Sequence, residues 1–249
     1  MIKLTKKNRA EILQHAAADA PNEACGLLVM AGRKQVYLEC DNVAAAPHET
    51  FEIDAYDWMS AADSGEIVAV VHSHPMGGHY LSGADRQTHA RSDLPWLLVA
   101  EGEIHQYRAC PHLRGRVFDY GKADCGTLVR DAFMLAGIDL PDHARTEIAA
   151  DAAGDYWQQH LTACGFKRVS DGLLQAGDVI LTAHGEYPDH ASVYLGGGEI
   201  LHHAYGQLSR REPYRDYWQD HTHSVWRLPQ WRPEMMQAIH NDLVHAVAL

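Results

Sequence analysis

The feature that most constrains the fold is an apolar run that ends in two histidines and is followed by a helix start. Residues 67–71 read IVAVV, the pattern of a buried β-strand, and residues 72–75, HSHP, follow directly. After six more residues, residues 82–85 read SGAD, the composition of a helix N-terminus. The chain must therefore form a sheet in which a helix begins close to the end of one strand.

Polar side chains at this junction can converge on one point. Side chains at i and i+2 of a strand share a face, so His72 and His74 form a chelating pair, and the first helical turn returns Asp85 to the same place. Two imidazoles and one carboxylate leave a tetrahedral zinc with an open position for water, as in catalytic sites. Glu23 is the candidate base for that water, and Ser82 could donate a hydrogen bond to an oxyanion. A closed structural zinc site is the alternative, although three ligands make a poor cage.

The complete pattern is a glutamate in PNEACGLLV, then H-S-H-P, six residues, a serine, two residues and an aspartate. It resembles the JAMM metallopeptidase motif over about residues 1–108. The resemblance implies an α/β domain in which His72, His74 and Asp85 bind Zn²⁺, Glu23 is general acid/base and Ser82 stabilises the intermediate. His79 lies outside the motif, and we expect it to face solvent. The second H-x-H, residues 221–223, has no acidic residue at a matching offset, so we expect a polar surface there.

A second group of reactive side chains lies in the other half of the chain. The segment YGKADCGTLVRDAF places Cys125 where a turn becomes a helix, and a helix N-terminus favours a thiolate and offers N–H groups to an oxyanion. His190 opens a predicted strand, and His202 follows across the turn of residues 196–198. Adjacent antiparallel strands would bring these two histidines together, His190 as base and His202 as the residue that orients it. His203 remains an alternative third member, but strand register favours His202.

The segments DCGTLV, LQAGDVI and H-x-x-x-Y-L-G-x-G-x-x-x-H together resemble the NlpC-type cell-wall cysteine peptidases over about residues 112–228. The resemblance implies a papain-like α+β fold, cleavage of peptidoglycan stem peptides, and the roles of nucleophile, base and third member for Cys125, His190 and His202. Gly126 replaces a usual serine, and Phe118 occupies a position often held by tyrosine. We expect the remaining cysteines to be packing residues: Cys25, Cys40, Cys110 and Cys164.

The pattern predicts two domains and a tail: a JAMM-like metallopeptidase domain at 1–110, an NlpC-type cysteine peptidase domain at 111–230 and a C-terminal helix at 231–249. Predicted helices cover 5–20, 54–63, 82–93, 125–136, 155–164 and 233–247. Predicted strands cover 25–31, 34–40, 67–71, 96–100, 103–109, 178–182, 191–195, 199–205 and 223–228. In the last helix, Met236, Ile239, Leu243 and Val247 fall on one face.

Composition excludes several classes of protein. No window of about 18 apolar residues exists, and the first residues lack a signal-peptide pattern, so we expect a cytoplasmic protein without membrane insertion. Five cysteines without a C-x-x-C pair argue against a disulfide framework and against a thiolate zinc site. The net charge is −12 and both halves are acidic, which argues against nucleic acid as a partner.

The order of the two motifs, together with runs such as AGIDLP, resembles the tail-tip assembly proteins of lambdoid phages. That resemblance implies a hydrolase with peptidoglycan peptides and other phage tail-tip proteins as partners, located in the host cytoplasm during phage assembly or in the virion tail tip. A non-catalytic assembly factor that uses both folds as binding modules is the competing hypothesis. A deubiquitinase-like enzyme is a third.

Overall fold

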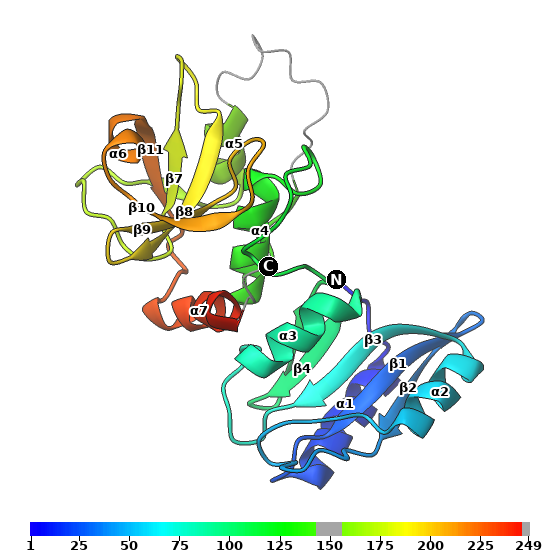
Figure 1. Ribbon diagram of the computed structural model, residues 1–249. Coiled ribbons are helices and arrows are strands. Elements are labelled where there is room, and N and C mark those ends of the chain that lie inside the picture. Colours follow the sequence, from blue (N-terminus) through cyan, green and yellow to red (C-terminus); the bar gives the residue numbers. More distant parts are fainter. Residues whose placement is uncertain (143–155, 246–249) are drawn as a thin grey trace. The chain divides into compact units, whose positions relative to one another are not determined.

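The computed structural model describes residues 1–142 and 156–245 (Figure 1). The chain divides into two compact units, Met1–Pro111 and His112–Leu249. Within the described residues, no helix is both long enough and apolar enough to cross a membrane.

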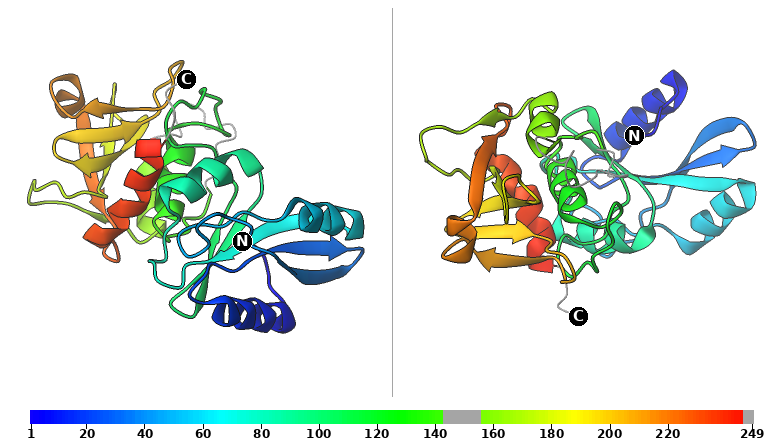
Figure 2. Two further views of the ribbon diagram at one scale, coloured as in Figure 1. Left: turned by 60° about the horizontal axis from the view of Figure 1, so that its bottom comes forward. Right: turned by 90° about the horizontal axis from the view of Figure 1, so that it is seen from above.

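The first unit is one mixed sheet with helices on both faces. Its elements are α1 Lys6–Asp19, β1 Cys25–Ala31, β2 Lys34–Cys40, α2 Ala55–Ser64, β3 Glu66–Ser73, α3 Gly83–Ser92, β4 Trp96–Ala100 and β5 Glu103–Tyr107. The strand order is β2-β1-β3-β4-β5, and only β3 and β4 pair in parallel. Helix α3 makes the connection between these two parallel strands, and α1 and α2 lie on opposite sides of the sheet (Figure 2).

Helix α1 covers one face of this sheet. Thr5 caps the helix by accepting a hydrogen bond from the Asn8 backbone N–H, and Ile12 of α1 packs against Leu28 of β1 and Val71 of β3. Because side chains alternate along a strand, the neighbour of Val71 points to the opposite face. His72 therefore lies on the face away from α1.

The second unit is built on an antiparallel sheet. Its elements are α4 Cys125–Leu135, α5 Tyr156–Ala163, β6 Lys167–Arg168, β7 Val179–Thr182, β8 His190–Gly196, β9 Glu199–His202, β10 Arg210–Pro213, α6 Tyr217–Asp220, β11 Thr222–Arg227, the 3₁₀ turn η1 Pro233–Met235 and α7 Met236–His245. The strand order is β10-β9-β8-β7-β11-β6.

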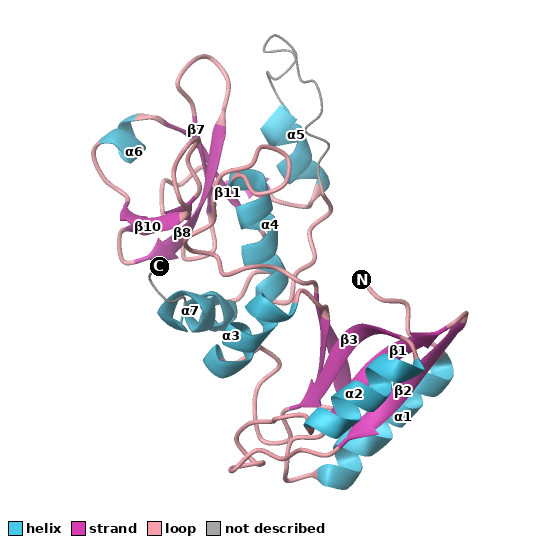
Figure 3. Cartoon of the chain, turned by 45° about the vertical axis from the view of Figure 1, so that its right-hand side comes forward, coloured by secondary structure: helices cyan, strands magenta, loops and turns pink. Residues whose placement is uncertain are grey.

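Two helices cover the faces of this sheet. Figure 3 shows α4 and α6 on opposite sides of β7 and β8. Helix α4 packs against β8 and β9, while Trp218 of α6 packs against Ile180 and Ile200. The N-terminus of α4 is therefore held beside the sheet that carries the histidines of β8 and β9.

The C-terminal helix α7 contacts the first residues of the second unit. The buried Asp242 carboxylate accepts a hydrogen bond from the Leu113 backbone N–H at 2.7 Å and lies 2.9 Å from His112 Nδ1. The predicted apolar face is confirmed for Met236, Ile239 and Leu243, which are buried. Val247 lies outside the described residues.

Most predicted elements are present within one or two residues of their expected bounds. Strand β9 is shorter than expected because it ends at His202, and Asp155, the expected start of α5, lies outside the described residues. Strands β6 and β10 and helix α6 were not predicted. Each of these three is four residues or fewer, too short for a periodic pattern to be recognised.

Candidate metal centre and candidate thiol site

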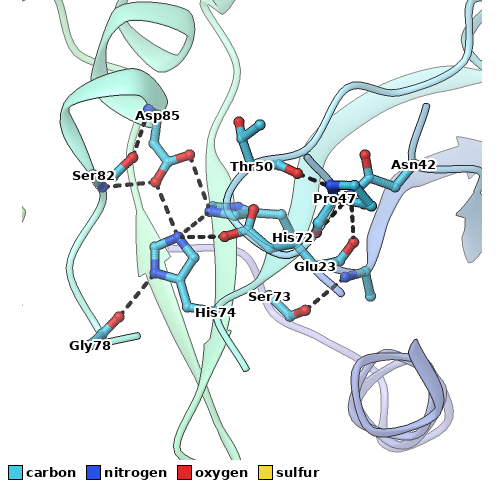
Figure 4. Close-up of polar contacts among 11 residues, drawn as sticks. Glu23, Asn42, Pro47, Thr50, His72, Ser73, His74, Gly78, Ser82 and Asp85 are labelled. Carbon is cyan, nitrogen blue, oxygen red and sulfur yellow. Dashed lines mark hydrogen bonds and ion pairs between the residues drawn. The ribbon is translucent and has the colours of Figure 1, made fainter. Parts of the chain in front are cut away.

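Strand β3 and helix α3 position three potential ligands of a metal ion. His72 lies in β3, and His74 keeps strand geometry because its backbone N–H donates to the Val99 carbonyl of β4 at 2.9 Å. Ser82 caps α3 reciprocally with Asp85: the Asp85 N–H donates to Ser82 Oγ at 3.1 Å, and the Ser82 N–H donates to Asp85 Oδ2 at 2.7 Å (Figure 4). This capping box fixes the carboxylate beside the two imidazoles.

The three side chains present their ligand atoms at the spacing of a tetrahedral site. His74 Nε2 is 3.2 Å from His72 Nε2 and 3.1 Å from Asp85 Oδ2, and His72 Nε2 is 3.6 Å from Asp85 Oδ1. Zinc bonds of about 2.0–2.1 Å at tetrahedral angles place two ligands about 3.3 Å apart. The group His72, His74 and Asp85 could therefore hold a metal ion.

The protonation states of two of the three side chains suit a metal ion. His74 Nδ1 donates to the Gly78 carbonyl at 3.0 Å, which turns Nε2 toward the other two side chains. Burial lowers the pKa of His74, but the neighbouring Asp85 outweighs it and raises that pKa, so His74 must release a proton to bind a metal. Burial lowers the pKa of His72. Burial also raises the pKa of Asp85, but the two imidazoles outweigh it and hold that pKa well below its usual range. Neutral imidazole and ionised carboxylate are the metal-binding forms.

Glu23 lies next to this set, at the start of β1. Its Oε1 is 3.7 Å from His74 Nε2, while its Oε2 is buried and has no hydrogen-bond partner. The backbone around it is fixed, since the Glu23 N–H donates to the Pro47 carbonyl at 2.7 Å and the Ala24 N–H donates to Ser73 Oγ at 2.8 Å. Burial raises the pKa of Glu23 to about 7. A carboxylate with that pKa and an unpaired oxygen can exchange protons near neutral pH.

His79 is less exposed than its place in the loop suggested. Its side chain is 36% exposed, and its ring stacks on His105 with centroids 5.2 Å apart. The expectation that it simply faces solvent is therefore wrong in part. The second H-x-H is at least partly exposed, with the His221 ring stacked on Tyr217 at 4.3 Å, in line with a polar surface.

In the second unit, Cys125 is the first residue of α4. The preceding residue, Asp124, caps the helix by accepting a hydrogen bond from the Thr127 N–H at 2.9 Å. Cys125 and His190, the first residue of β8, line the same cavity, whose volume is about 1020 Å³. The structure thus places a thiol at a helix N-terminus and an imidazole in the lining of one cavity.

Strand register determines which histidine lies beside His190. Ser192 pairs with His202 across β8 and β9, and Ser192 shares a face with His190, so His190 and His202 lie on one face. Their ring centroids are 5.5 Å apart and the rings are nearly perpendicular. His203 takes the opposite direction and contacts Phe118, with centroids 5.1 Å apart.

The two histidines have complementary unpaired atoms. His190 Nε2 and His202 Nδ1 are both buried without a hydrogen-bond partner. Burial lowers the pKa of His190 to about 3, and the neighbouring His202 and His184 act in the same direction. A neutral imidazole can accept a proton, but a pKa this low makes His190 a weak base until its Nε2 gains a hydrogen-bond partner.

Several residues of this cavity were missed by sequence analysis. Glu212 lies 2.9 Å from His202 Nε2 through its Oε2, and the Trp218 ring is 4.6 Å from the His202 ring. His184 Nδ1 lies 2.7 Å from Asp189 Oδ2 at the cavity rim. No local pattern marks these residues, because they reach the site only through the pairing of short elements.

None of the five cysteines, all of which lie in the described part of the chain, forms a disulfide. Cys25, Cys40 and Cys110 are buried, as expected of packing residues. Cys164 is only partly buried, and its Sγ lies 3.6 Å from His160 Nε2 one helical turn away. Cys164 is therefore the thiol against which the reactivity of Cys125 is best compared.

Comparison with known proteins gives a consistent result for both units. Residues 5–110 match the family described as prokaryotic homologs of the JAB domain, and residues 115–227 match the NlpC/P60 family. The chain is 49% identical over 191 residues to the tail tip assembly protein K of Escherichia phage lambda, covering 76% of this chain and 96% of that protein. It is 36% identical over 233 residues to the protein of the same name from Escherichia phage N15, covering 90% and 95%.

Two solved structures are also similar. A solution structure of a Desulfitobacterium hafniense protein matches with a TM-score of 0.38 and 28% identity, covering 43% of this chain and 83% of that one. The peptidoglycan hydrolase RipB from Mycobacterium tuberculosis matches with a TM-score of 0.32 and 23% identity, covering 48% and 54%. The two family matches by themselves confirm the expected fold class: a JAB-like α/β domain is followed by an NlpC/P60 papain-like α+β domain.

Proposed function

The chain belongs to the family of phage tail tip assembly proteins K, and from that premise we propose that it is a tail-tip assembly protein whose two domains are both peptidases. The proposed domains are a JAMM-like metallopeptidase at 1–110 and an NlpC-type cysteine peptidase at 111–230, followed by a C-terminal helix at 231–249. The observation that carries the proposal is the cavity that both Cys125 and His190 line.

In the cysteine peptidase, Cys125 is the nucleophile and His190 its base. The thiol proton moves to His190, the sulfur attacks the peptide carbonyl, and His190 returns the proton to the leaving amine. The backbone N–H groups at the start of α4 stabilise the oxyanion. His202 orients His190 from the same face of the sheet. The substrates are peptidoglycan stem peptides, a class supported by membership of the NlpC/P60 family.

In the first domain, His72, His74 and Asp85 would hold Zn²⁺. The ion would supply Lewis-acid chemistry and lower the pKa of water when bound. Glu23 takes a proton from the attacking water and passes it to the leaving group, as its pKa of about 7 and its unpaired Oε2 allow. Ser82, at the start of α3, donates a hydrogen bond to the oxyanion. The proposed substrate of this site is a peptide or an isopeptide.

The competing function is a non-catalytic assembly factor that uses both folds as binding modules. The unpaired Glu23 oxygen and the unpaired imidazole nitrogens favour the enzyme. A binding module gains nothing from such buried atoms, each of which destabilises the fold by about 1–3 kcal/mol. Sites that retain unpaired polar groups at reactive positions are typical of catalysis.

The partners and location follow from the relatives. The matched proteins of phages lambda and N15 are named for tail tip assembly. We therefore assign other phage tail-tip proteins as partners and the host cytoplasm during assembly, or the virion tail tip, as the location. The acidic net charge of −12 disfavours nucleic acid as a partner.

Cleavage of defined muropeptides by the purified chain tests the cysteine site. Wild-type protein should cleave them, Cys125→Ala should not, and Cys164→Ala should retain the wild-type rate. Cys125 should also react with iodoacetamide faster than Cys164 near neutral pH. Intact muropeptides after prolonged incubation with folded wild-type protein would support the non-catalytic assembly factor instead.

The two sites should act independently, because their residues occupy separate units. A chelator should remove the zinc and any metal-dependent cleavage while sparing muropeptide cleavage, and a thiol alkylator should do the reverse. Glu23→Ala should retain bound metal and lose the activity of that site. Circular dichroism checks that chelation leaves the fold intact. Loss of cysteine-dependent cleavage from a folded, zinc-free protein would contradict independence.

A further inference from the structure

We propose that Glu212 is a positioning residue of the thiol site, which sets the tautomer of His202 and, through it, the tautomer of His190. The inference rests on the proposed roles of Cys125 and His190. It assigns a fourth residue to the site, from β10, and gives that residue a function that can be measured without any substrate.

The Glu212 carboxylate is held in one orientation by surrounding donors. Arg210 donates to Glu212 Oε2 from Nε at 3.0 Å, with its Nη2 2.7 Å from the same oxygen, and the Trp218 side chain donates to the carboxylate as well. The same oxygen lies 2.9 Å from His202 Nε2. The register of β9 and β10 produces this contact, because Arg210 pairs with His202 and Glu212 follows two residues later.

The contact determines where the His202 proton resides. An ionised carboxylate only accepts hydrogen bonds, so His202 Nε2 must carry the proton. The neutral His202 ring then has its lone pair on Nδ1. That atom is buried and has no partner.

The tautomer of His202 in turn determines the tautomer of His190. Its Nε2 is also buried without a partner, and the two rings share one face of the sheet with centroids 5.5 Å apart. A small side-chain rotation would let His190 Nε2–H donate to His202 Nδ1 and satisfy both atoms. His190 Nδ1 would then carry the lone pair, and Cys125 lines the same cavity as His190.

The proton balance of the site follows directly. The Cys125 thiol proton moves to His190 Nδ1, which leaves a thiolate and an imidazolium. Both remaining N–H bonds stay in place, one from His190 to His202 and one from His202 to Glu212. The Glu212 charge stabilises the imidazolium through His202, without itself taking a proton.

Other charged and titratable groups near these rings cannot replace Glu212. Arg210 has no acceptor, and His203 points to the opposite face of β9. His184 lies at the cavity rim, where its two nitrogens contact Asp189 and the Tyr217 hydroxyl. Glu212 is thus the carboxylate in contact with His202 among the described residues.

The test compares Glu212→Ala and Glu212→Gln with a matched control. Glu199→Ala breaks the ion pair of Glu199 with Arg211 in the same β9–β10 hairpin and touches neither imidazole. The first measurement is the rate at which iodoacetamide alkylates Cys125 as a function of pH, with carbon–sulfur bond formation and release of iodide. The second is ¹⁵N NMR of the histidine rings, which reports which nitrogen carries the proton.

Glu212→Ala should slow alkylation of Cys125 at pH 7 by at least about 10-fold and move the His202 and His190 protons away from Nε2. Glu212→Gln keeps an uncharged acceptor and should fall between Ala and wild type. Glu199→Ala should match wild type in both measurements. A folded Glu212→Ala protein with wild-type alkylation and unchanged tautomers would overturn the proposal. If Glu212→Ala does not fold, a wild-type alkylation rate in Glu212→Gln would overturn it.

These readouts separate the inference from the proposed function. If wild-type protein cleaves no muropeptide yet the Glu212 variants change tautomer and thiol reactivity as expected, the substrate assignment fails and the positioning role stands. If muropeptides are cleaved and the tautomers do not respond to Glu212, the proposed function stands and the positioning role is refuted.

Discussion

Asp85 combines two roles that can be separated by experiment: it completes the proposed ligand set, and it forms the capping box of α3 with Ser82. Ser82→Ala removes the cap but leaves all three ligands. Asp85→Ala removes the capping interaction and one of the three ligands. Loss of a serine cap destabilises a helix by about 1 kcal/mol. Zinc at 100 times its dissociation constant stabilises a complete site by about 2.7 kcal/mol.

Hydrogen exchange of the backbone amides of residues 66–107, measured by mass spectrometry with and without zinc, gives both quantities for the first unit. Ser82→Ala should lose about 1 kcal/mol without metal and keep the increment of about 2.7 kcal/mol. The Asp85→Ala protein should lose a similar amount of stability in the absence of zinc, and zinc should add almost no stability to it. His79→Ala is the matched control, because His79 lies in the same loop and its ring stacks on His105 and is not part of the proposed ligand set.

Three results would refute this reasoning. An Asp85→Ala protein that keeps the full zinc increment would remove Asp85 from the ligand set. A His79→Ala protein that loses the increment would bring the loop histidine into it. Loss of the increment in Ser82→Ala would mean that the cap, and not the carboxylate alone, holds the site together.

Two further predictions concern the second unit. The pKa of His190 is about 3 in the folded chain against 6.5 for an unperturbed histidine, so the unfolded chain binds more protons between these values. Stability should be complete above pH 6.5 and fall by roughly 2 kcal/mol by pH 5, a loss absent in His190→Gln when urea unfolding is repeated at each pH. At Gly177, where φ is +93°, an added Cβ would come within 2.1 Å of the Trp231 ring. Gly177→Ala should destabilise the second unit by roughly 3 kcal/mol in thermal unfolding. At Gly172, where φ is +70°, an added Cβ would meet no atom within 4 Å, so Gly172→Ala should destabilise it by only about 1 kcal/mol.

The proposed ligand set could be predicted because every step toward it is local. His72 and His74 share a face through strand alternation, and Asp85 returns through a capping box three residues long. Each rule acts over fewer than a dozen residues. No knowledge of which strands pair was needed to bring the three side chains together, so the pattern of residue types carried enough information.

The surroundings of the second site could not be predicted in the same way. Glu212 reaches His202 only because β10 pairs with β9, and the four residues of β10, RREP, show none of the apolar alternation of a strand. The choice of His202 over His203 could be predicted only by assuming that the strands on either side of the turn at 196–198 pair, and the register of β8 against β9 agrees with it. Register is a property of two segments together, so a single segment contains only half of the information.

The contacts of the Asp242 carboxylate with His112 and Leu113 determine the order in which the two units can fold during translation. These contacts span 129 and 130 residues, so the second unit cannot be completed until its far end has left the ribosome. At 5–20 residues per second, the ribosome needs roughly 7–26 s to cover that distance. The first unit, which ends at Pro111, can fold during this interval. A nascent chain would therefore carry the assembled group of His72, His74 and Asp85 long before its second unit is complete, and thiol reactivity should appear only after Asp242 has left the ribosome.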